Sequence, residues 1–194
     1  MLGVVLSGGQ SSRMGSDKGL LVTSGKTWAQ HAYDKLRKLN IPVVISINPL
    51  QKSLYEDVFP SDLLIDDLDV IDFKGPLAAV LSVHSKYPEE DLFVLACDMT
   101  DMEPSLLREL YDHYRQKPSF HAFVFAIDGE PEPLCSIYSH KGLSTILKRH
   151  LTGDAFKKSM KMMLEHLPAM WIPVPKDKTA YFKNVNDRDE YLCM

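Results

Sequence analysis

The sequence predicts an α/β domain in which a mostly parallel sheet lies between two layers of helices. Short, nearly continuous apolar runs rich in β-branched residues alternate along the chain with amphipathic segments. Strands that are covered on both faces show such runs rather than strict alternation of apolar and polar residues. Strands that alternate with helical patterns are typical of βαβ units, and therefore of a three-layer α/β/α arrangement.

The first half of the chain carries the clearest elements. Trp28, Ala32, Leu36 and Leu39 are spaced by four, four and three residues, which places them on one face of a helix. Pro76 begins a second apolar segment and suits the first turn of a helix. The expected strands are residues 3–6, 43–47, 63–65 and 92–96, and a third helix is expected at 103–115.

The second half is less regular. Two apolar runs, 122–126 and 134–138, flank the Pro-rich segment 128–133, which we interpret as a turn between two strands. Without internal repeats or a low-complexity linker, residues 1–194 are expected to form one domain. The remaining expected elements are helices at 139–150, 154–167 and 187–192, and short strands at 171–174 and 181–185.

The composition excludes two classes of protein. Over 194 residues, 26 acidic side chains outnumber 22 basic ones, giving a formal net charge of −4. A general nucleic-acid binder needs a surplus of cations that neutralise phosphates, so nucleic acid is not an expected partner. No apolar run approaches the roughly 18–20 residues of a membrane span, so no membrane partner is expected. Three widely spaced cysteines favour a reducing cytoplasm.

Polar residues follow three of the expected strands. They are the loop from Ser7 to Lys18, the pair Asp66-Asp67, and Asp98. In open parallel sheets, ligands bind beyond the carboxyl ends of the strands. These three features are therefore expected to converge on one site.

The loop after the first strand suits a phosphate ligand. Gly8 and Gly9 allow a sharp turn that brings several backbone N–H groups to an anion. Arg13 grips two oxygens at once, and Lys18 adds a compact charge. The spacing matches neither the Walker P-loop nor the dinucleotide fingerprint. The alternative is an ordinary loop with solvated cations.

Carboxylates and amides supply the other candidate contacts. Asp98 ends an apolar strand and is the candidate Mg²⁺ ligand, the alternative being a helix cap or loop carboxylate. Asp67 suits a base, a ribose or the outer shell of a metal, but it also lies in an acidic segment that solvent alone explains. Asn184 and Asn186 point to one side if the segment is extended and then suit a heterocycle edge, whereas turn asparagines are the commoner explanation.

These residues also carry a family resemblance. The string LSGGQSSRMGSDKGLL at residues 6–21 resembles the LAGGxSxRMGxDKxLL signature of nucleotidyltransferases with a Rossmann-like, glycosyltransferase-A-type core. Within that superfamily the chain is most similar to the molybdenum cofactor guanylyltransferases. The resemblance continues at IDD (65–67), KGPLA (74–78), ACD (96–98) and FKNVN (182–186), and it is weak over 120–175.

The resemblance implies a reaction and its participants. GMP would pass from GTP to molybdopterin, giving the guanine dinucleotide cofactor and pyrophosphate, with Mg²⁺ as the metal. Residues 1–100 would form the nucleotide-binding half and 101–194 the acceptor-binding half. Proteins that deliver the cofactor or receive it would be further partners.

The resemblance also implies a role for individual residues. Leu6, Ser7 and Gly8 would contact guanine and ribose. Gly9, Arg13 and Lys18 would contact the phosphates, and Asp67 would hold the nucleoside. Asp98 would bind Mg²⁺, and Asn184 and Asn186 would lie on the molybdopterin side. Ser46, with Asn48 two positions later, stands where the family has an Asn close to the base.

Other functions remain open at this point. A cytidylyltransferase acting on molybdopterin or another small phosphorylated acceptor would share the loop and the carboxylates. A nucleotide-binding adaptor would keep the loop without turnover. A sugar transferase of the same fold would carry a DxD metal motif, where this chain has Asp98-Met99-Thr100.

Overall fold

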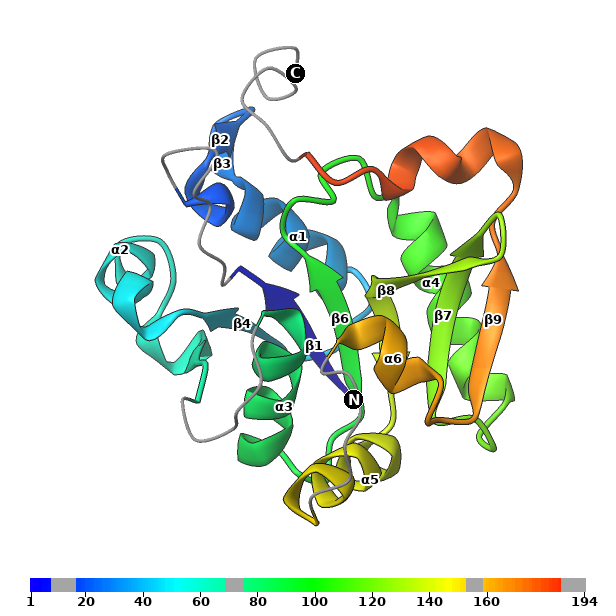
Figure 1. Cartoon of the computed structure of the whole chain (residues 1–194). Coiled ribbons are helices and arrows are strands. Elements are labelled where there is room, and N and C mark those ends of the chain that lie inside the picture. Colours follow the sequence, from blue (N-terminus) through cyan, green and yellow to red (C-terminus); the bar gives the residue numbers. More distant parts are fainter. Residues whose placement is uncertain (8–16, 69–74, 153–158, 186–194) are drawn as a thin grey trace.

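The structure, a computed structural model, describes residues 1–7, 17–68, 75–152 and 159–185. Its centre is a seven-stranded mixed sheet in the order β5-β4-β1-β6-β8-β7-β9, with helices on both sides (Figure 1). The strands of this sheet are β1 (Leu2–Leu6), β4 (Val43–Ile47), β5 (Leu64–Asp66), β6 (Leu92–Ala96), β7 (Ala122–Ile127), β8 (Glu130–Tyr138) and β9 (Ala169–Pro173). This is the predicted three-layer fold.

Most neighbouring strands run parallel. β1 pairs in parallel with both β4 and β6, β4 with β5, and β7 with β9. β8 is antiparallel to β6 and to β7, which makes the sheet mixed. The helices are α1 (Trp28–Arg37), α2 (Lys52–Glu56), α3 (Pro76–Lys86), α4 (Pro104–Gln116), α5 (His140–Leu151) and α6 (Met160–Leu164).

The two faces of the sheet bury two separate apolar cores. On one face, side chains such as Val5 and Phe93 pack against residues of α1, α2 and α4. On the other, Val4 and Val94 pack against α3, α5 and α6. Because successive strand residues point to opposite faces, β1, β4 and β6 are buried along their whole lengths. This explains the continuous apolar runs of the sequence.

Local sequence signals set the beginnings of the helices. Thr27 and Gln30 form a capping box at α1, and the Ser139 hydroxyl accepts the Gly142 amide at α5. Pro76 and Pro104 occupy the first positions of α3 and α4, where a missing N–H costs nothing.

The segment 128–133 is not a turn as expected. Only Asp128 and Gly129 form the turn, both with positive φ, and Ile127 already pairs with Glu130. The prolines are tolerated because the pairing of β8 with β6 reaches only to Cys135. Pro131 and Pro133 lie beyond it, where no ladder donor is required on that side.

The C-terminal expectations are partly wrong. Residues 181–185 do not form a strand: 3₁₀ helix η4 (Lys176–Phe182) covers the first of them. Phe182 packs its ring 5.1 Å from that of Phe125, so its apolar character reflects a single anchor. In the described part of the helix expected at 154–167, α6 covers Met160–Leu164 and is capped by Ser159, whose backbone is extended. Residues 154–158 and the helix expected at 187–192 lie outside the described residues.

Several short elements were not predicted. Hairpin strands β2 (Val22–Thr23) and β3 (Lys26–Thr27) are joined by Ser24 and Gly25, both at positive φ. Besides η4 and α2, the missed elements are the 3₁₀ turns η1 (Lys18–Leu20), η2 (Pro49–Gln51) and η3 (Ser61–Leu63). Each is shorter than the span over which hydrophobic periodicity becomes readable. None of the helices in the described ranges has the length and apolar character needed to cross a bilayer.

At the edge of the sheet where β6 begins, the partly buried carboxylate of Asp91 joins three elements. Asp91 accepts hydrogen bonds from the His140 amide at 2.7 Å, the His140 ring at 2.6 Å and the Tyr114 hydroxyl at 2.7 Å. Burial alone would raise the pKa of Asp91, but these hydrogen bonds outweigh it and hold the pKa below its ordinary value.

Asp91→Asn should therefore destabilise the fold in a pH-dependent way. A carboxylate whose folded-state pKa is depressed stabilises the protein above its unfolded-state pKa and loses that effect as pH falls through the folded-state pKa. We expect the free energy of unfolding at pH 7 to drop by about 2 kcal/mol. Below about pH 4 the difference from the wild type should shrink. Urea denaturation from pH 3 to pH 7 measures both.

Glu130→Gln provides the control for Asp91→Asn. Glu130 is paired with Lys161 at 3.0 Å, but its side chain is 72% exposed, so the exchange should leave the unfolding free energy unchanged. Equal stability of Asp91→Asn and the wild type at pH 7 would show that Asp91 does not tie these elements together.

Candidate functional site

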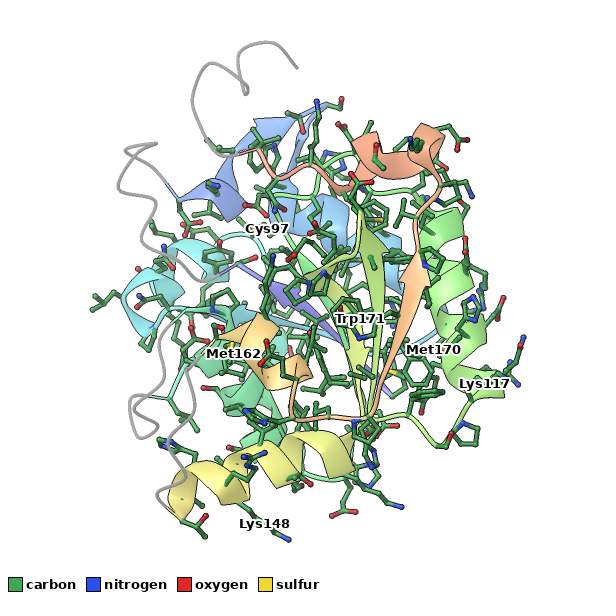
Figure 2. All side chains as sticks on the ribbon, turned by 45° about the vertical axis from the view of Figure 1, so that its right-hand side comes forward. Cys97, Lys117, Lys148, Met162, Met170 and Trp171 are labelled. Atoms are coloured by element: carbon green, nitrogen blue, oxygen red, sulfur yellow. The ribbon has the colours of Figure 1, made fainter. Side chains whose placement is uncertain are left out.

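The strand register brings the polar strand ends to one level. Leu6 lies opposite both Ser46 and Ala96, and Ser46 lies opposite Ile65. Asp67 and Asp98, which lie two positions beyond Ile65 and Ala96, therefore lie at the same edge of the sheet. Figure 2 labels Cys97, which directly follows β6, at the opposite end of the molecule from Lys148 of α5. The site expected from the sequence lies at the Cys97 end.

Lys18 and Asp98 are the central pair. Lys18 begins η1, which leads from the first loop toward α1, and Asp98 follows β6. The Lys18 Nζ lies 3.1 Å from Asp98 Oδ2, and the two side chains are 19% and 18% exposed. Two residues 80 positions apart, each singled out by the sequence, thus form an ion pair that solvent still reaches.

The late Asn segment meets this pair. The Val185 amide donates to the backbone carbonyl of Asp98 at 3.2 Å. Val185 itself is buried beside Trp28. Asn184 is therefore held one residue from the Asp98 loop, while Asn186 lies outside the described residues.

Ser46 and Asp67 form a second, partly buried pair on the other side of β1. The Ser46 hydroxyl donates to Asp67 Oδ1 at 2.6 Å, and Ser46 is fully buried. The pKa of Asp67 is raised, because burial disfavours the carboxylate and Asp66 adds a like charge, while the hydrogen bond from Ser46 acts in the opposite direction. Asp66 is itself paired with Lys52 at 2.8 Å.

The two pairs are separated by the width of the central strands. β4 and β1 lie between β5, which precedes Asp67, and β6, which precedes Asp98. Neighbouring strands are about 4.8 Å apart, so β5 and β6, the strands that precede the two carboxylates, stand about 14 Å apart. β1 lies between β4 and β6, and the strand order therefore changes direction at β1. In open α/β sheets, ligands bind beyond the carboxyl ends of the strands at such a point.

Leu6 and Ser7 lie between the pairs and are largely engaged by the fold. The Ser7 amide donates to the Ser46 carbonyl at 3.0 Å, and the Leu6 carbonyl accepts the Cys97 amide at 3.1 Å. Leu6 packs in the core under α3. Gly8, Gly9 and Arg13 lie outside the described residues, so their proposed contacts stay predictions.

Two residues at the site, Lys35 and Tyr55, were not predicted from the sequence. Lys35 of α1 donates to the carbonyl oxygens of Met99 and Thr100, directly after Asp98. Burial lowers its pKa to about 8. Tyr55 of α2 donates to Asp17, the residue before Lys18, at 2.9 Å. None of these contacts is local, and no motif or spacing signals them.

The donor set bears on which metal would fit. The described residues contain no group of three or more His, Cys, Asp or Glu side chains that could hold a metal ion. That disfavours a closed site of the zinc type among them. Mg²⁺ needs only one or two carboxylates and fills its shell with water and phosphate oxygens, so a solvent-accessible Asp98 suits it.

Comparison with known proteins gives one consistent picture. Residues 3–170 match the family described as a MobA-like NTP transferase domain. A probable molybdenum cofactor guanylyltransferase from Flavobacterium johnsoniae is 31% identical over 96% of this chain and 92% of its own length. One from Geobacillus sp. is 30% identical over 98% and 96%.

The solved structures agree on the fold. Molybdopterin-guanine dinucleotide biosynthesis protein A from Archaeoglobus fulgidus superposes with a TM-score of 0.78, covering 100% of this chain and 96% of its own. At 22% identity this likeness shows the fold alone. A nucleotidyl transferase from Methanothermobacter thermautotrophicus has a TM-score of 0.72, with 99% and 94% covered.

The hydrogen bond between Ser46 and Asp67 predicts a pH-dependent effect of Ser46→Ala. Removing the hydroxyl takes a donor from the partly buried carboxylate of Asp67, which raises the pKa of Asp67 further. We expect the free energy of unfolding at pH 7 to fall by about 2 kcal/mol. A raised folded-state pKa costs stability only above the unfolded-state pKa, so the loss should fade as pH approaches about 3.9.

Ser136→Ala is the matched control for Ser46→Ala. Ser136 is also fully buried in a strand, but its hydroxyl donates to the uncharged backbone carbonyl of Glu132 at 3.0 Å. Its loss should cost the same at every pH in urea denaturation. If Ser46→Ala showed this same flat profile, Asp67 would not be the group that Ser46 stabilises.

Proposed function

The chain belongs to the MobA-like NTP transferase family, and from this premise we propose that it transfers GMP from GTP to molybdopterin and releases pyrophosphate. Two relatives that match nearly its whole length at 30–31% identity are named as probable molybdenum cofactor guanylyltransferases. The observation in the structure that supports the proposal best is the Lys18–Asp98 pair, which places one cation and one accessible carboxylate at the end of β1 and β6.

The reaction is a displacement at phosphorus. A terminal phosphate oxygen of molybdopterin forms a bond to the α-phosphorus of GTP, and the bond from that phosphorus to the oxygen bridging the α- and β-phosphates breaks. The product is the guanine dinucleotide form of the cofactor, and pyrophosphate leaves with the electron pair. Because the attacking oxygen is already anionic, the enzyme needs no strong base. Its task is to position the two phosphates and to neutralise the charge that develops.

Lys18 is suited to the leaving group. Its ammonium group is held at the end of β1 by η1 and is accessible to solvent. Once a nucleotide is present, we propose that Lys18, together with Arg13, donates to the phosphates and stabilises the departing pyrophosphate. Gly8 and Gly9 would supply backbone donors from the same loop.

The nucleoside fits the other end of the site. Asp67 follows β5 and Asp98 follows β6, two strands that stand about 14 Å apart, which leaves room for a nucleotide across the strand ends between them. The Asp67 carboxylate accepts from Ser46 and has further acceptor capacity for N–H or O–H groups of guanine or ribose. We therefore propose that Ser46 and Asp67 lie beside the nucleoside of GTP, and that Leu6 and Ser7 contact its guanine and ribose from below.

Mg²⁺ is the proposed metal, and Asp98 would hold it. When bound, the ion would supply a positive charge that neutralises phosphate oxygens. Asp98 suits this role, since its carboxylate is at the sheet edge and partly exposed. Lys18 balances the Asp98 charge in the structure described here.

The acceptor side is assigned to the second half of the chain. We propose that Asn184 and Asn186 face molybdopterin, because Val185 ties this segment to the Asp98 loop. Proteins that deliver or receive the cofactor are proposed as partners. The cytoplasm is the proposed compartment, since Cys97 and Cys135 are buried and free.

The proposal is tested by product formation. Purified protein, molybdopterin and Mg²⁺ are incubated with GTP, CTP or ATP in turn, and dinucleotide and pyrophosphate are quantified. We expect product with GTP at a rate at least about tenfold above the others, which corresponds to about 1.4 kcal/mol of discrimination. Faster transfer from CTP would replace the guanylyltransferase with a cytidylyltransferase, and no product with any nucleotide would favour an adaptor.

Asp98→Asn should remove most of this activity while the fold survives. The amide keeps the shape of the side chain but loses the charge that would hold Mg²⁺, so we expect turnover to fall about 100-fold. The control is Asp34→Asn on α1, which breaks an exposed carboxylate–lysine pair with Lys26 of β3. Unchanged turnover of Asp98→Asn, with circular dichroism matching the wild type, would refute a role for this carboxylate.

A further inference from the structure

We propose that Tyr55 and Asp17 are positioning residues that hold Lys18 in register with Asp98. The inference rests on the proposed function, because it concerns the residue that would stabilise the leaving pyrophosphate. Neither side chain needs to touch the nucleotide for the role. What they fix is the short stretch of backbone from which the Lys18 side chain extends.

Tyr55 reaches across the sheet end from α2. Its side chain is completely buried, yet its hydroxyl donates to Asp17 Oδ1 at 2.9 Å and lies 3.4 Å from the carbonyl oxygen of Ser7. Ser7 directly follows β1, and Asp17 lies at the other end of the loop, directly before η1. One phenol group therefore holds the two ends of the loop that carries the proposed phosphate contacts.

Asp17 passes this constraint to Lys18. Its backbone is extended and its Oδ1 also accepts the Gly19 amide at 2.9 Å, so Asp17 caps the 3₁₀ turn that Lys18 begins. The backbone of Lys18 thus lies between the residue that caps the turn, Asp17, and the residue whose amide Asp17 accepts, Gly19. With the turn fixed, its Nζ lies 3.1 Å from Asp98 Oδ2.

The Tyr55 hydroxyl occupies the space beside Gly19 that a larger residue would fill with its Cβ atom. A Cβ atom on Gly19 would lie 2.2 Å from the Tyr55 hydroxyl oxygen and 3.2 Å from the Ser7 Cβ. Tyr55 cannot move away easily, because its ring is buried and stacks 6.5 Å from that of Phe59. Only glycine at position 19 lets the phenol approach Asp17.

The electrostatics favour an intact hydrogen bond at neutral pH. Burial raises the pKa of Tyr55, with the charge of Asp17 acting in the same direction, so the phenol stays protonated as a donor. Burial also raises the pKa of Asp17, while the hydrogen bonds from Tyr55 and from the Gly19 and Leu20 amides lower it. The Tyr55 hydroxyl thus helps to keep Asp17 ionised beside the turn.

Tyr55→Phe tests the inference, because it removes the hydroxyl and keeps the ring. We expect kcat for dinucleotide formation to fall about tenfold, since a loosened Lys18 loses part of its alignment. KM for GTP should change less than about twofold, because the binding groups remain. Assays are run well below the unfolding temperature of each variant, which circular dichroism defines.

A double-mutant cycle with Lys18→Ala shows whether Tyr55 acts on the rate through Lys18 or through a general loss of rigidity in the protein. If Tyr55 acts through Lys18, then Tyr55→Phe should have no further effect on single-turnover rates in the Lys18→Ala background. Equal reductions in both backgrounds would overturn the inference. Asp17→Asn, which keeps an acceptor for Tyr55 and Gly19, should retain most activity, and Asp17→Ala should resemble Tyr55→Phe.

Tyr114→Phe is the matched control. It also removes a phenol that donates to a partly buried carboxylate, Asp91, at 2.7 Å, but at the opposite edge of the sheet. It should lower stability without changing kcat. A wild-type protein that makes no dinucleotide would overturn the proposed function, whereas an active wild type matched in kcat by Tyr55→Phe would overturn this inference alone.

Discussion

The parallel pairing of β1 with β4 on one side and β6 on the other is the constraint on which the rest of the structure depends. It places Leu6 level with Ser46 and Ala96, so that the polar residues beyond these strands emerge at one edge. A shift of one residue in either register would turn the side chains of a strand to the opposite faces of the sheet. The apolar side chains would then no longer pack in their own core, which would cost much of the stability of the fold. The alignment of Lys18 with Asp98 is thus stabilised by burial far from the pair itself.

Charged groups are treated differently at the two edges of the sheet. At the edge where β6 begins, Asp91 is surrounded by donors and the pKa is lowered, which stabilises the fold. At the opposite edge, burial raises the pKa of Asp17 and Asp67 and lowers that of Lys35. Ionisable groups whose pKa values are shifted by burial are typical of functional sites. This contrast marks the same edge that the motifs indicate.

The sequence predicts the fold and the centre of the site where the signal is local. β1, β4 and β6 follow from apolar runs, α1 from its apolar spacing and α3 from its proline, and Lys18 and Asp98 follow from their positions after strands. It fails for Phe182 and Val185, whose apolar character reflects separate anchors rather than a strand. Tyr55 and Lys35 could not be found, because their roles arise from contacts between residues 38 or more positions apart. Tertiary contacts of this kind leave no periodic or spacing signal.

In the proposed complex, one nucleotide lies along the carboxyl edge of the sheet from Asp67 to Asp98. The most direct test is a crystal structure with Mg²⁺ and a GTP analogue in which a methylene group replaces the oxygen between the α- and β-phosphates. We expect phosphate oxygens within hydrogen-bonding distance of Lys18 Nζ and the guanosine beside Asp67. A nucleotide bound at another surface, or bound here with its phosphates away from Lys18, would contradict it.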